Sequence, residues 1–461
     1  MTHKDENLTL KSSNHTWSGK FGFLMAAVGS AVGLGNIWRF PYLAGQQGGA
    51  LFLIAYVIMV VVIGFSLMIA EFTIGRHAAR NVVDAYSVAG KKWGFTGVIS
   101  CIASFVIVAY YSVIGGWIIR YAVGYMDGGS FVESGDYNAV FSSFVGNPWM
   151  PIVFLIIFMA ICLTVILLGV KNGIERVNKI LMPLLFVMLV FVMIVALTMK
   201  GAFEGVKFFI VPDFGRIEAS GGVAGIFLAA LGQAFYSLSI GLGIGTTYGS
   251  YASKEISLTK NTLLICVSDT VVAMIAGFAI LPAVFAADEE PTAGAGLVFV
   301  VLPAVFHAMP PVLGSIVGVV FFLLVLFAAV TSAIALIEVN VAVVVEKFRL
   351  NRKLAAVIVV GAATLVGVLV SLSQGGFIGK VDLLTIFDTF SNTFLLPLVG
   401  ILTCIYVGYV WKPANAAKEL AAHDPAAAKP SFVAVWSANI RYVCPVLIAI
   451  LFVYGIVDLF I

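Results

Sequence analysis

Long apolar segments dominate this chain and limit its fold more than any other feature. About eleven stretches of roughly 20 or more residues are long enough to cross a bilayer. Such stretches must be helical, because a segment inside hydrocarbon has to satisfy its own backbone hydrogen bonds. With 61% hydrophobic and only 11% charged residues in 461, the sequence predicts an all-α polytopic membrane protein. We place the spans near residues 20–45, 50–76, 93–124, 150–170, 174–199, 222–250, 257–286, 312–345, 353–373, 382–411 and 433–460.

The loops between these spans carry different charges on the two sides of the predicted bundle. Cations gather in every second loop, whereas acidic residues gather in the others. Because Lys and Arg are retained on the cytoplasmic side, this pattern predicts a cytoplasmic N-terminus. The cationic loops contain Arg76, Arg80, Lys91, Lys92, Lys171, Lys254, Lys347 and Lys412, and the acidic loops contain Asp127, Asp136, Asp213 and Asp288.

Two of the spans contain helix breakers at bilayer depth. The first has Gly33 and Gly35 close to Arg39 and Pro41, and the sixth has a run of Ser and Gly over 237–245. Each of these spans leads a group of five, an arrangement typical of transporters whose site lies at the membrane midplane. The alternative is that the glycines are close packing contacts between helices. We favour broken helices, because polar and glycine clusters recur in both spans.

A helix that breaks inside a membrane exposes backbone groups of both polarities. The half before the break ends in free carbonyls, and the half after it begins with free N–H groups and a positive dipole end. An amino acid fits such a site, because its carboxylate can bind helix N-termini and its ammonium can bind carbonyls. The breaks therefore predict an amino-acid site, with the remaining oxygens shared by hard cations such as Na⁺.

Polar side chains within the apolar spans are consistent with this prediction. Asp269 in the seventh span is the most costly, because an ionisable group inside a membrane is expensive and usually functional. The alternative for Asp269 is a partnered structural carboxylate, and hydroxyl groups can instead bond to their own helix. Tyr110 and Tyr111 lie in the middle of the third span, where a phenol would bind either a substrate carboxylate or a neighbouring helix. The neutral oxygen donors are Asn36, Ser237, Thr331 and Ser332.

Several motifs follow one another in the order found in one known family. The run from Val32 to Pro41, VGLGNIWRFP, resembles the signature of the neurotransmitter:sodium symporters, as do QAFYSLSIG from Gln233 and AAVTS from Ala328. The resemblance implies a LeuT-like fold of two inverted five-helix repeats with discontinuous helices 1 and 6. It divides the chain into a cytoplasmic segment (1–19), a first repeat (20–199), an extracellular loop (200–221), a second repeat (222–411), a cytoplasmic loop (412–432) and an eleventh helix (433–461).

The resemblance also implies two sodium sites beside a substrate pocket. The first sodium site would use the substrate carboxylate with Ala31 (carbonyl), Asn36, Ser237 and Asp269. The second would use the carbonyls of Gly29, Val32 and Ala328 and the hydroxyls of Thr331 and Ser332. The substrate pocket maps to Ala31, Leu34, Gly35, Ile107, Tyr111, Tyr236, Ser237, Ser239, Leu242, Ser332 and Leu336.

The gates of the family have counterparts here, with one exception. Arg39 and Asp388 match the outer ionic gate. Trp17 and Glu346 match the inner gate, but Asn14 stands where the family has an arginine. The aromatic lid maps to Tyr111 and Tyr236, the carboxylate that supports span six to Glu71, and the surroundings of the family's chloride site to Tyr56, Gln233 and Ser237.

Two positions indicate what kind of member this chain would be. Chloride-independent relatives carry a fixed carboxylate, usually at the position held here by Ala273. This chain has Asp269 one helical turn away, so we expect transport without chloride. Leu242 replaces a phenylalanine in the pocket, which favours a hydrophobic substrate, aromatic amino acids included.

Other functions remain open from the residues alone. A proton-coupled or proton-antiporting carrier on the same fold would titrate Asp269, and a non-transporting amino-acid sensor would share the pocket. The intact sodium ligands argue against the sensor. We do not expect an enzyme, because no nucleophile–base pair or metal-ligand cluster accompanies the site. The expected location is a bacterial inner membrane, and the expected partners are the amino acid and the lipid bilayer, with no nucleic acid and an open oligomeric state.

Overall fold

The computed structural model describes residues 16–129, 131, 135–289, 296–421, 424, 427 and 429–458. Within these residues the chain forms helices and no β-strand. Nine helices in the described residues are long and apolar enough to cross a membrane, and a tenth span is a helix pair bent by 47° at a short break. The prediction of an all-α polytopic membrane protein is confirmed.

The first half of the chain begins with the bent pair. α1 (Lys20–Ala31) is followed by the π-helical turn η2 (Gly35–Arg39) and by α2 (Phe40–Gln46). Pro41 lies where α2 continues directly from η2, so its missing N–H leaves one bond of this helix unmade. The other elements are α3 (Ala50–Met59), η3 (Val60–Gly64), α4 (Phe65–Ala78), α5 (Val82–Tyr86), η4 (Lys91–Trp93), α6 (Gly94–Met126), α7 (Tyr137–Val145), α8 (Met150–Leu167), η6 (Val170–Glu175) and α9 (Arg176–Thr198).

The second half also begins with an interrupted helix. α11 (Gly222–Ser237) stops in the middle of the predicted sixth span, and α12 (Ile244–Ser250) resumes beyond it. Both predicted breaks are therefore present. The remaining elements are α10 (Ala202–Ile210), η7 (Phe214–Arg216), α13 (Leu258–Ala286), η8 (Leu297–Val301), α14 (Leu302–His307), α15 (Pro311–Phe348), α16 (Arg352–Gln374), α17 (Leu383–Thr389), η9 (Phe390–Leu395), α18 (Leu396–Ile405), η10 (Tyr406–Val410), α19 (Pro413–Ala421), α20 (Pro430–Ala438), η11 (Asn439–Val443) and α21 (Cys444–Asp458).

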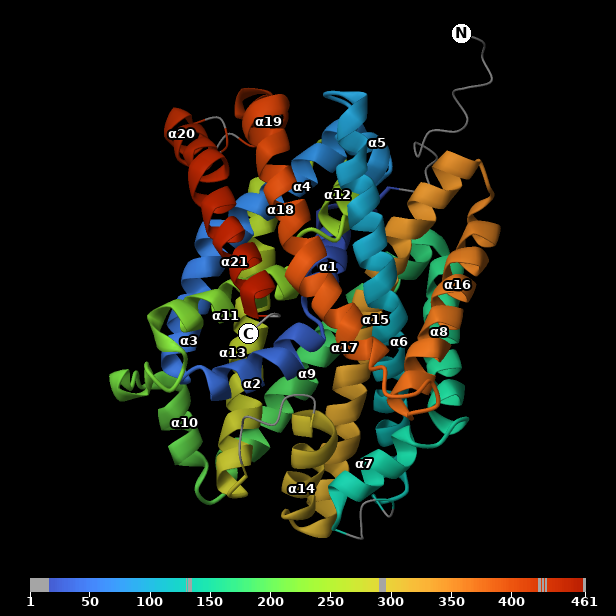
Figure 1. Ribbon diagram of the computed structural model, residues 1–461, viewed down its shortest axis with the longest axis vertical. Coiled ribbons are helices and arrows are strands. Elements are labelled where there is room, and N and C mark those ends of the chain that lie inside the picture. The colour runs from blue at the N-terminus through green and yellow to red at the C-terminus, as the bar shows by residue number, and fades with distance from the viewer. Residues whose placement is uncertain are drawn as a thin grey trace.

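The two interrupted helices run in opposite directions through the centre of the bundle. In Figure 1, the chain descends from α1 to α2, whereas it rises from α11 to α12. α12 packs against α1 and α4, and η2 packs against α11 and α13. The long helices α6 and α15 pack along each other beside them. This arrangement brings both breaks to the middle of the molecule.

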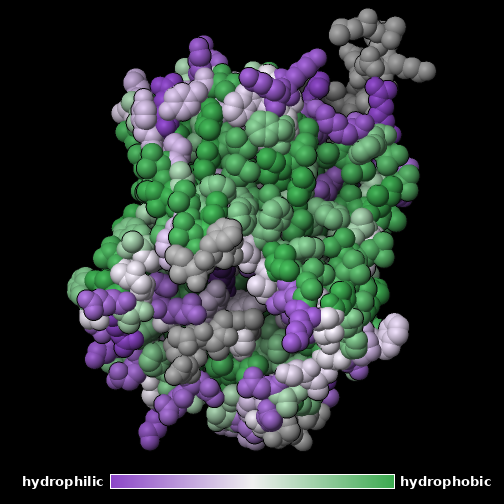
Figure 2. Space-filling model, viewed as in Figure 1, coloured by the Kyte–Doolittle hydropathy of each residue, from purple (hydrophilic) through white to green (hydrophobic). Residues whose placement is uncertain are grey.

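The surface of the protein matches a position in a bilayer. Figure 2 shows a hydrophobic band across the drawn face, with hydrophilic residues gathered towards the two ends of the molecule. Large apolar side chains on the outer helices are exposed at the surface, including Leu365 on α16 at 70% and Val435 on α20 at 71%. Large contiguous apolar surface of this kind is rare on a soluble monomer and is expected where lipid covers it.

Candidate functional site

The first break consists of Val32, Gly33 and Leu34, between α1 and η2. Val32 adopts extended backbone angles, so the α-helical hydrogen-bond ladder stops there. The Asn36 side chain accepts a hydrogen bond from the Gly33 N–H at 3.1 Å, which partly replaces the lost ladder. All three residues are buried, so their remaining backbone groups face other protein groups and not lipid.

The second break runs from Leu238 to Gly243 and is stabilised differently. Ser239, Gly241 and Gly243 have φ values of 55°, 84° and 72°, in the left-handed region where glycine has no steric cost. The Gly241 N–H donates to the carboxylate of Glu71 on α4 at 2.8 Å. Glu71 is only 2% exposed, so this acceptor is an internal part of the break.

Hydrogen bonds connect the two breaks directly. The Ser239 hydroxyl donates to the Ser30 carbonyl at the end of α1, at 3.0 Å. The Gln233 amide on α11 donates to the Gly35 carbonyl at the start of η2, at 2.8 Å. Residues about two hundred positions apart thus form one polar centre inside an apolar bundle.

A single carboxylate organises this centre. Asp269 on α13 is fully buried and accepts hydrogen bonds from the Asn36 amide at 2.8 Å and from the Ser237 hydroxyl at 2.8 and 2.9 Å. The Tyr56 hydroxyl on α3 donates to Asp269 Oδ2 at 2.6 Å. Hydrogen bonds to an ionised group contribute about 1.5–3 kcal/mol each. Because all three donors are neutral side chains, they leave the negative charge of Asp269 available to a cation.

The residues expected at the second sodium site lie where α1 faces α15. The hydroxyl of Thr331 donates to the Ala328 carbonyl at 3.0 Å, within its own helix. The Ser332 hydroxyl lies 3.5 Å from the Ser30 carbonyl. The first break passes so close that a Cβ placed on Gly33 would lie 2.5 Å from the Ser332 Oγ. Carbonyl and hydroxyl oxygens from two helices, with no positive charge, are the donor set that suits Na⁺ at a broken helix.

A narrow cavity lies between the breaks and α6 and α15. The space in it that is open to the centres of water molecules is about 30 Å³, so the cavity is narrow. It includes every predicted substrate residue except Ser237, which is bonded to Asp269 instead. The hydroxyl of Tyr111 is buried and lies beside Leu34 and Ser332. The lining residues are Ser30, Ala31, Gly33, Leu34, Gly35, Ile107, Tyr111, Tyr236, Ser239, Leu242, Ile244, Ser332 and Leu336.

Three of these lining residues were missed at the sequence level, namely Ser30, Gly33 and Ile244. Ser30 and Gly33 flank residues that were selected in the first break. Ile244 is the first residue of α12, directly after the second break. Taking every residue of both breaks, together with the last two residues before the first break and the first residue after the second, would have found them.

The residues expected at the outer gate are close together but are not paired as expected. The Arg39 guanidinium lies over the Tyr236 ring, 5.0 Å from its centroid, and one of its nitrogens has no hydrogen-bond partner among the described residues. Asp388 accepts hydrogen bonds from the Tyr110 hydroxyl at 2.9 Å and from the Asn392 amide at 2.8 Å. The gate carboxylate is therefore held by neutral groups here. Tyr110 bonds to a neighbouring helix, while Tyr111 faces the pocket.

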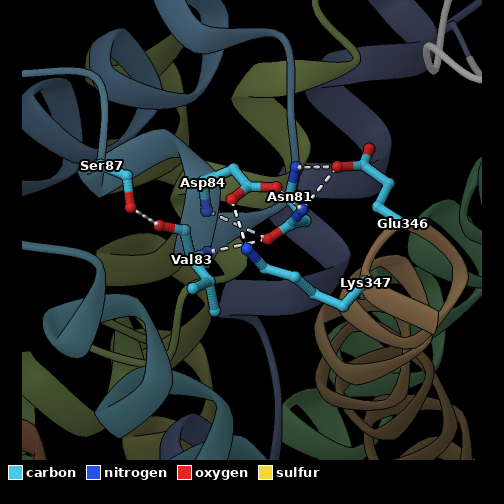
Figure 3. Close-up of polar contacts among 6 residues, drawn as sticks. All are labelled: Asn81, Val83, Asp84, Ser87, Glu346 and Lys347. Atoms are coloured by element: carbon cyan, nitrogen blue, oxygen red, sulfur yellow. Dashed lines mark hydrogen bonds and ion pairs between the residues drawn. The ribbon is translucent and has the colours of Figure 1, made fainter. Parts of the chain in front are cut away.

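The residues expected at the inner gate have different partners. Trp17 packs against Tyr248 and Tyr251 and donates to the Tyr248 carbonyl at 3.0 Å. Glu346, near the end of α15, accepts hydrogen bonds from Asn81, as Figure 3 shows. Asn14, where the family has an arginine, is outside the described residues.

Comparisons with known proteins agree along nearly the whole chain. Residues 14–129 and 142–460 match the model of the sodium:neurotransmitter symporter family. The uncharacterized sodium-dependent transporter YhdH of Bacillus subtilis is 36% identical over 445 residues, which cover 95% of this chain and 96% of YhdH. An uncharacterized sodium-dependent transporter of Haemophilus influenzae is 32% identical over 463 residues, which cover 96% of this chain and 99% of that protein.

A solved structure shows the same architecture. The crystal structure of MhsT in complex with L-phenylalanine has a TM-score of 0.86 and 39% sequence identity with this chain. The match covers 95% of this chain and 99% of MhsT. The protein is therefore a sodium-dependent, multi-pass membrane transporter and not an enzyme. The chain belongs to the sodium:neurotransmitter symporter family.

Proposed function

We propose that this protein is a sodium-coupled symporter that imports a large hydrophobic or aromatic amino acid and needs no chloride. The observation that carries the proposal is the buried carboxylate of Asp269, which accepts hydrogen bonds from Asn36 in the first broken helix and from Ser237 in the second. A fixed negative charge at this position can balance the charge of a sodium ion, so that no bound chloride is needed to do so. Tyr56, Gln233 and Ser237, which would surround chloride in other members, instead bind protein groups.

The proposed sodium sites use the oxygens of both breaks. Asp269, Asn36, Ser237 and the Ala31 carbonyl would hold the first ion together with the substrate carboxylate. Because the substrate is itself a ligand of that ion, each would raise the affinity for the other. The second ion would bind to the carbonyls of Gly29, Val32 and Ala328 and the hydroxyls of Thr331 and Ser332.

The proposed substrate class follows from the lining of the pocket. Tyr111 and the free N–H groups beyond the first break would bind the carboxylate, and the side chain would lie among Ile107, Leu242 and Leu336. A pocket with aliphatic side chains at these positions accepts a bulky apolar group. One methylene of fit contributes only about 1–3 kcal/mol, so the class is better defined than the individual amino acid. The similarity to MhsT, which was solved with L-phenylalanine, supports the same class.

The proposed orientation places the N-terminus in the cytoplasm of a bacterium, with the chain in the inner membrane. The concentration of Lys and Arg in the loops at one end of the bundle supports this orientation. We further propose that residues 20–199 and 222–411 are the two inverted repeats, because each range begins with an interrupted helix. The segments 1–19, 200–221 and 412–432 would then be connections at the two membrane faces, and 433–461 an additional helix.

A binding screen combined with uptake tests the proposal. Thermal unfolding of the purified protein with each of the twenty amino acids should shift upwards only for large hydrophobic ones, and only with Na⁺, because binding to the native state raises stability. Uptake into proteoliposomes should stop when choline replaces Na⁺ and should continue when gluconate replaces chloride. Concentrative uptake in choline would instead support a proton-coupled carrier. Sodium-dependent binding without any uptake would support a sensor.

A further inference from the structure

Asn81 lies at the junction between α4 and α5, and the two halves of its side-chain amide make different contacts. It is fully buried, and its Oδ1 accepts hydrogen bonds from the N–H groups of Val83 and Asp84, at 3.0 and 3.2 Å. These bonds cap the N-terminus of α5. The carbonyl half of the amide is therefore sufficient to explain a structural role, and the amino half is left for another contact.

The amino half of Asn81 binds the end of a distant helix. Its Nδ2 donates to Glu346 Oε2 at 2.5 Å and also to Asp84 Oδ2 at 2.8 Å, and its backbone N–H donates to Glu346 Oε2 at 3.1 Å. The Glu346 carboxylate, near the end of α15, is thus held by two neutral donors from Asn81 (Figure 3). Beside this contact, the Lys347 ammonium and the Asp84 carboxylate form an ion pair at 2.5 Å.

These contacts join two packed units of the bundle. α4 packs so tightly against α12 that a Cβ on Gly75 would lie 1.9 Å from the Thr246 carbonyl oxygen. α15 packs along α6, and its residues 332, 336 and 340, spaced at four, lie on one face that begins at the pocket. The Asn81–Glu346 contact therefore adds a polar link between the unit that contains the second broken helix and the unit that forms the opposite wall of the pocket, beside the direct packing of α12 on α15 and of α5 on α6.

We propose that Asn81 is a positioning residue that holds the Glu346 carboxylate at the α4–α5 junction, and thereby keeps the Lys- and Arg-rich end of the transport pathway closed. This inference rests on the proposed function, because it assigns a gate to that transporter. Because Asn81 is neutral, releasing Glu346 leaves no unpaired cation behind at the junction, so a contact of this kind can be broken and remade in every cycle.

The test measures how readily a pathway residue is reached from that end. The parent chain carries the reporter Asn340→Cys, one helical turn beyond Leu336, and Cys101→Ser at the partly exposed cysteine; every variant shares the loss of the Asn340–Ser104 hydrogen bond. A membrane-impermeant thiosulfonate is applied to inverted vesicles without substrate. In Asn81→Asp, the cap of α5 is retained, because aspartate caps as well as asparagine, but the new carboxylate faces those of Glu346 and Asp84, which both accept from the Asn81 amide. The labelling rate should rise about tenfold, as expected for a shift of about 1.4 kcal/mol between closed and open states.

Three further variants separate the gate from general effects. Glu346→Ala, which leaves α5 untouched, should also accelerate labelling. The double variant Asn81→Asp with Glu346→Gln restores a donor–acceptor pair and should return the rate to within about twofold of the parent. Asn351→Asp, at the N-cap of α16 where Asn351 accepts from the Leu354 N–H, is the matched control and should leave the rate unchanged.

The inference is overturned if Asn81→Asp and Glu346→Ala are labelled at the parent rate, if the double variant stays as fast as Asn81→Asp, or if Asn351→Asp is accelerated as well. Sodium-dependent uptake by the parent, measured in vesicles of the same preparation, reports on the proposed function separately. Absent uptake with the expected labelling pattern would contradict the transport function and leave the Asn81 contact supported.

Discussion

The chain interrupts two of its membrane helices, and glycine serves a different purpose in each break. In the first break, no residue has a positive φ, and Gly33 and Gly35 provide space: a Cβ on Gly35 would lie 2.9 Å from the Tyr236 ring. In the second, Gly241 and Gly243 provide conformation, since both are left-handed. In the first break, the hydrogen-bond acceptor for a freed N–H is Asn36, which follows closely in the same segment. In the second, the acceptor is Glu71 on another helix.

This difference indicates how the two breaks depend on the rest of the protein. The first break is defined largely by close approach to α15 and α11, so changes there should alter the pocket before they alter the fold. The second break holds a strained backbone and a buried carboxylate, so changes there should lower the stability of the protein. Asp269 connects the two, and its loss should affect both.

Asp269→Asn should therefore have the largest effect. It removes the charge that accepts bonds from both breaks, and sodium-driven uptake should fall roughly tenfold or more, as expected when a desolvated charge partner is lost. Uptake into proteoliposomes, compared in chloride and in gluconate, measures this loss. The residual uptake should depend on chloride. The double variant Asp269→Asn with Ala273→Glu moves the carboxylate by one helical turn and should restore chloride-independent uptake. Unchanged, chloride-indifferent uptake in the single variant would contradict the role of Asp269.

Glu71→Ala tests the second break by removing its acceptor. The Gly241 N–H would be left buried without a partner, at a cost of about 1–3 kcal/mol, and thermal unfolding should occur at a lower temperature. Glu71→Gln is the matched control, because its side-chain oxygen can still accept the bond, and it should lie closer to the parent. Equal destabilisation by both variants would show that the charge of Glu71, and not its bond to Gly241, matters.

Gly241→Ala and Gly33→Ala compare the two uses of glycine, namely a left-handed backbone in the second break and close packing in the first. Gly241→Ala forces a side chain into the left-handed region, which costs about 1–2 kcal/mol and should lower the unfolding temperature. Gly33→Ala has no such backbone cost, but its Cβ would displace the Ser332 hydroxyl. We expect the apparent affinity for Na⁺ to fall several-fold in Gly33→Ala with a smaller change in stability. If both variants lose stability equally, the distinction between the two breaks is wrong.

Leu242→Phe should have the smallest effect, since it changes only the wall of the pocket next to the second break. The larger ring reduces the space for the substrate, so affinity should shift from aromatic towards smaller hydrophobic amino acids, by about tenfold at most. Competition for sodium-dependent binding measures the ratio of the two classes. An unchanged ratio would remove Leu242 from the determinants of specificity.

Much of the fold follows from the sequence, because hydropathy and helix breakers act locally. The predicted first span, 20–45, corresponds to Lys20–Gln46 with its break in the expected place, and the predicted span 312–345 corresponds to Pro311–Phe348. The residues expected around the pocket lie together, although their roles stay proposals. What the sequence pattern could not predict were hydrogen-bond partners: Asp388 lies close to Arg39, yet it accepts hydrogen bonds from Tyr110 and Asn392.

The sequence by itself determined where the chain crosses the membrane and where two crossings are interrupted, since apolar length and helix breakers need no distant partner to act. Only the tertiary structure decided what completes each interruption. Asn36, Ser237 and Asp269 are separated by up to 233 positions along the chain, and packing alone brings them within hydrogen-bonding distance. In the same way, Asn81 reaches Glu346 only because α5 and α15 meet at one end of the bundle. In lipid, every buried polar group needs such a partner, and the fold determines which one it finds.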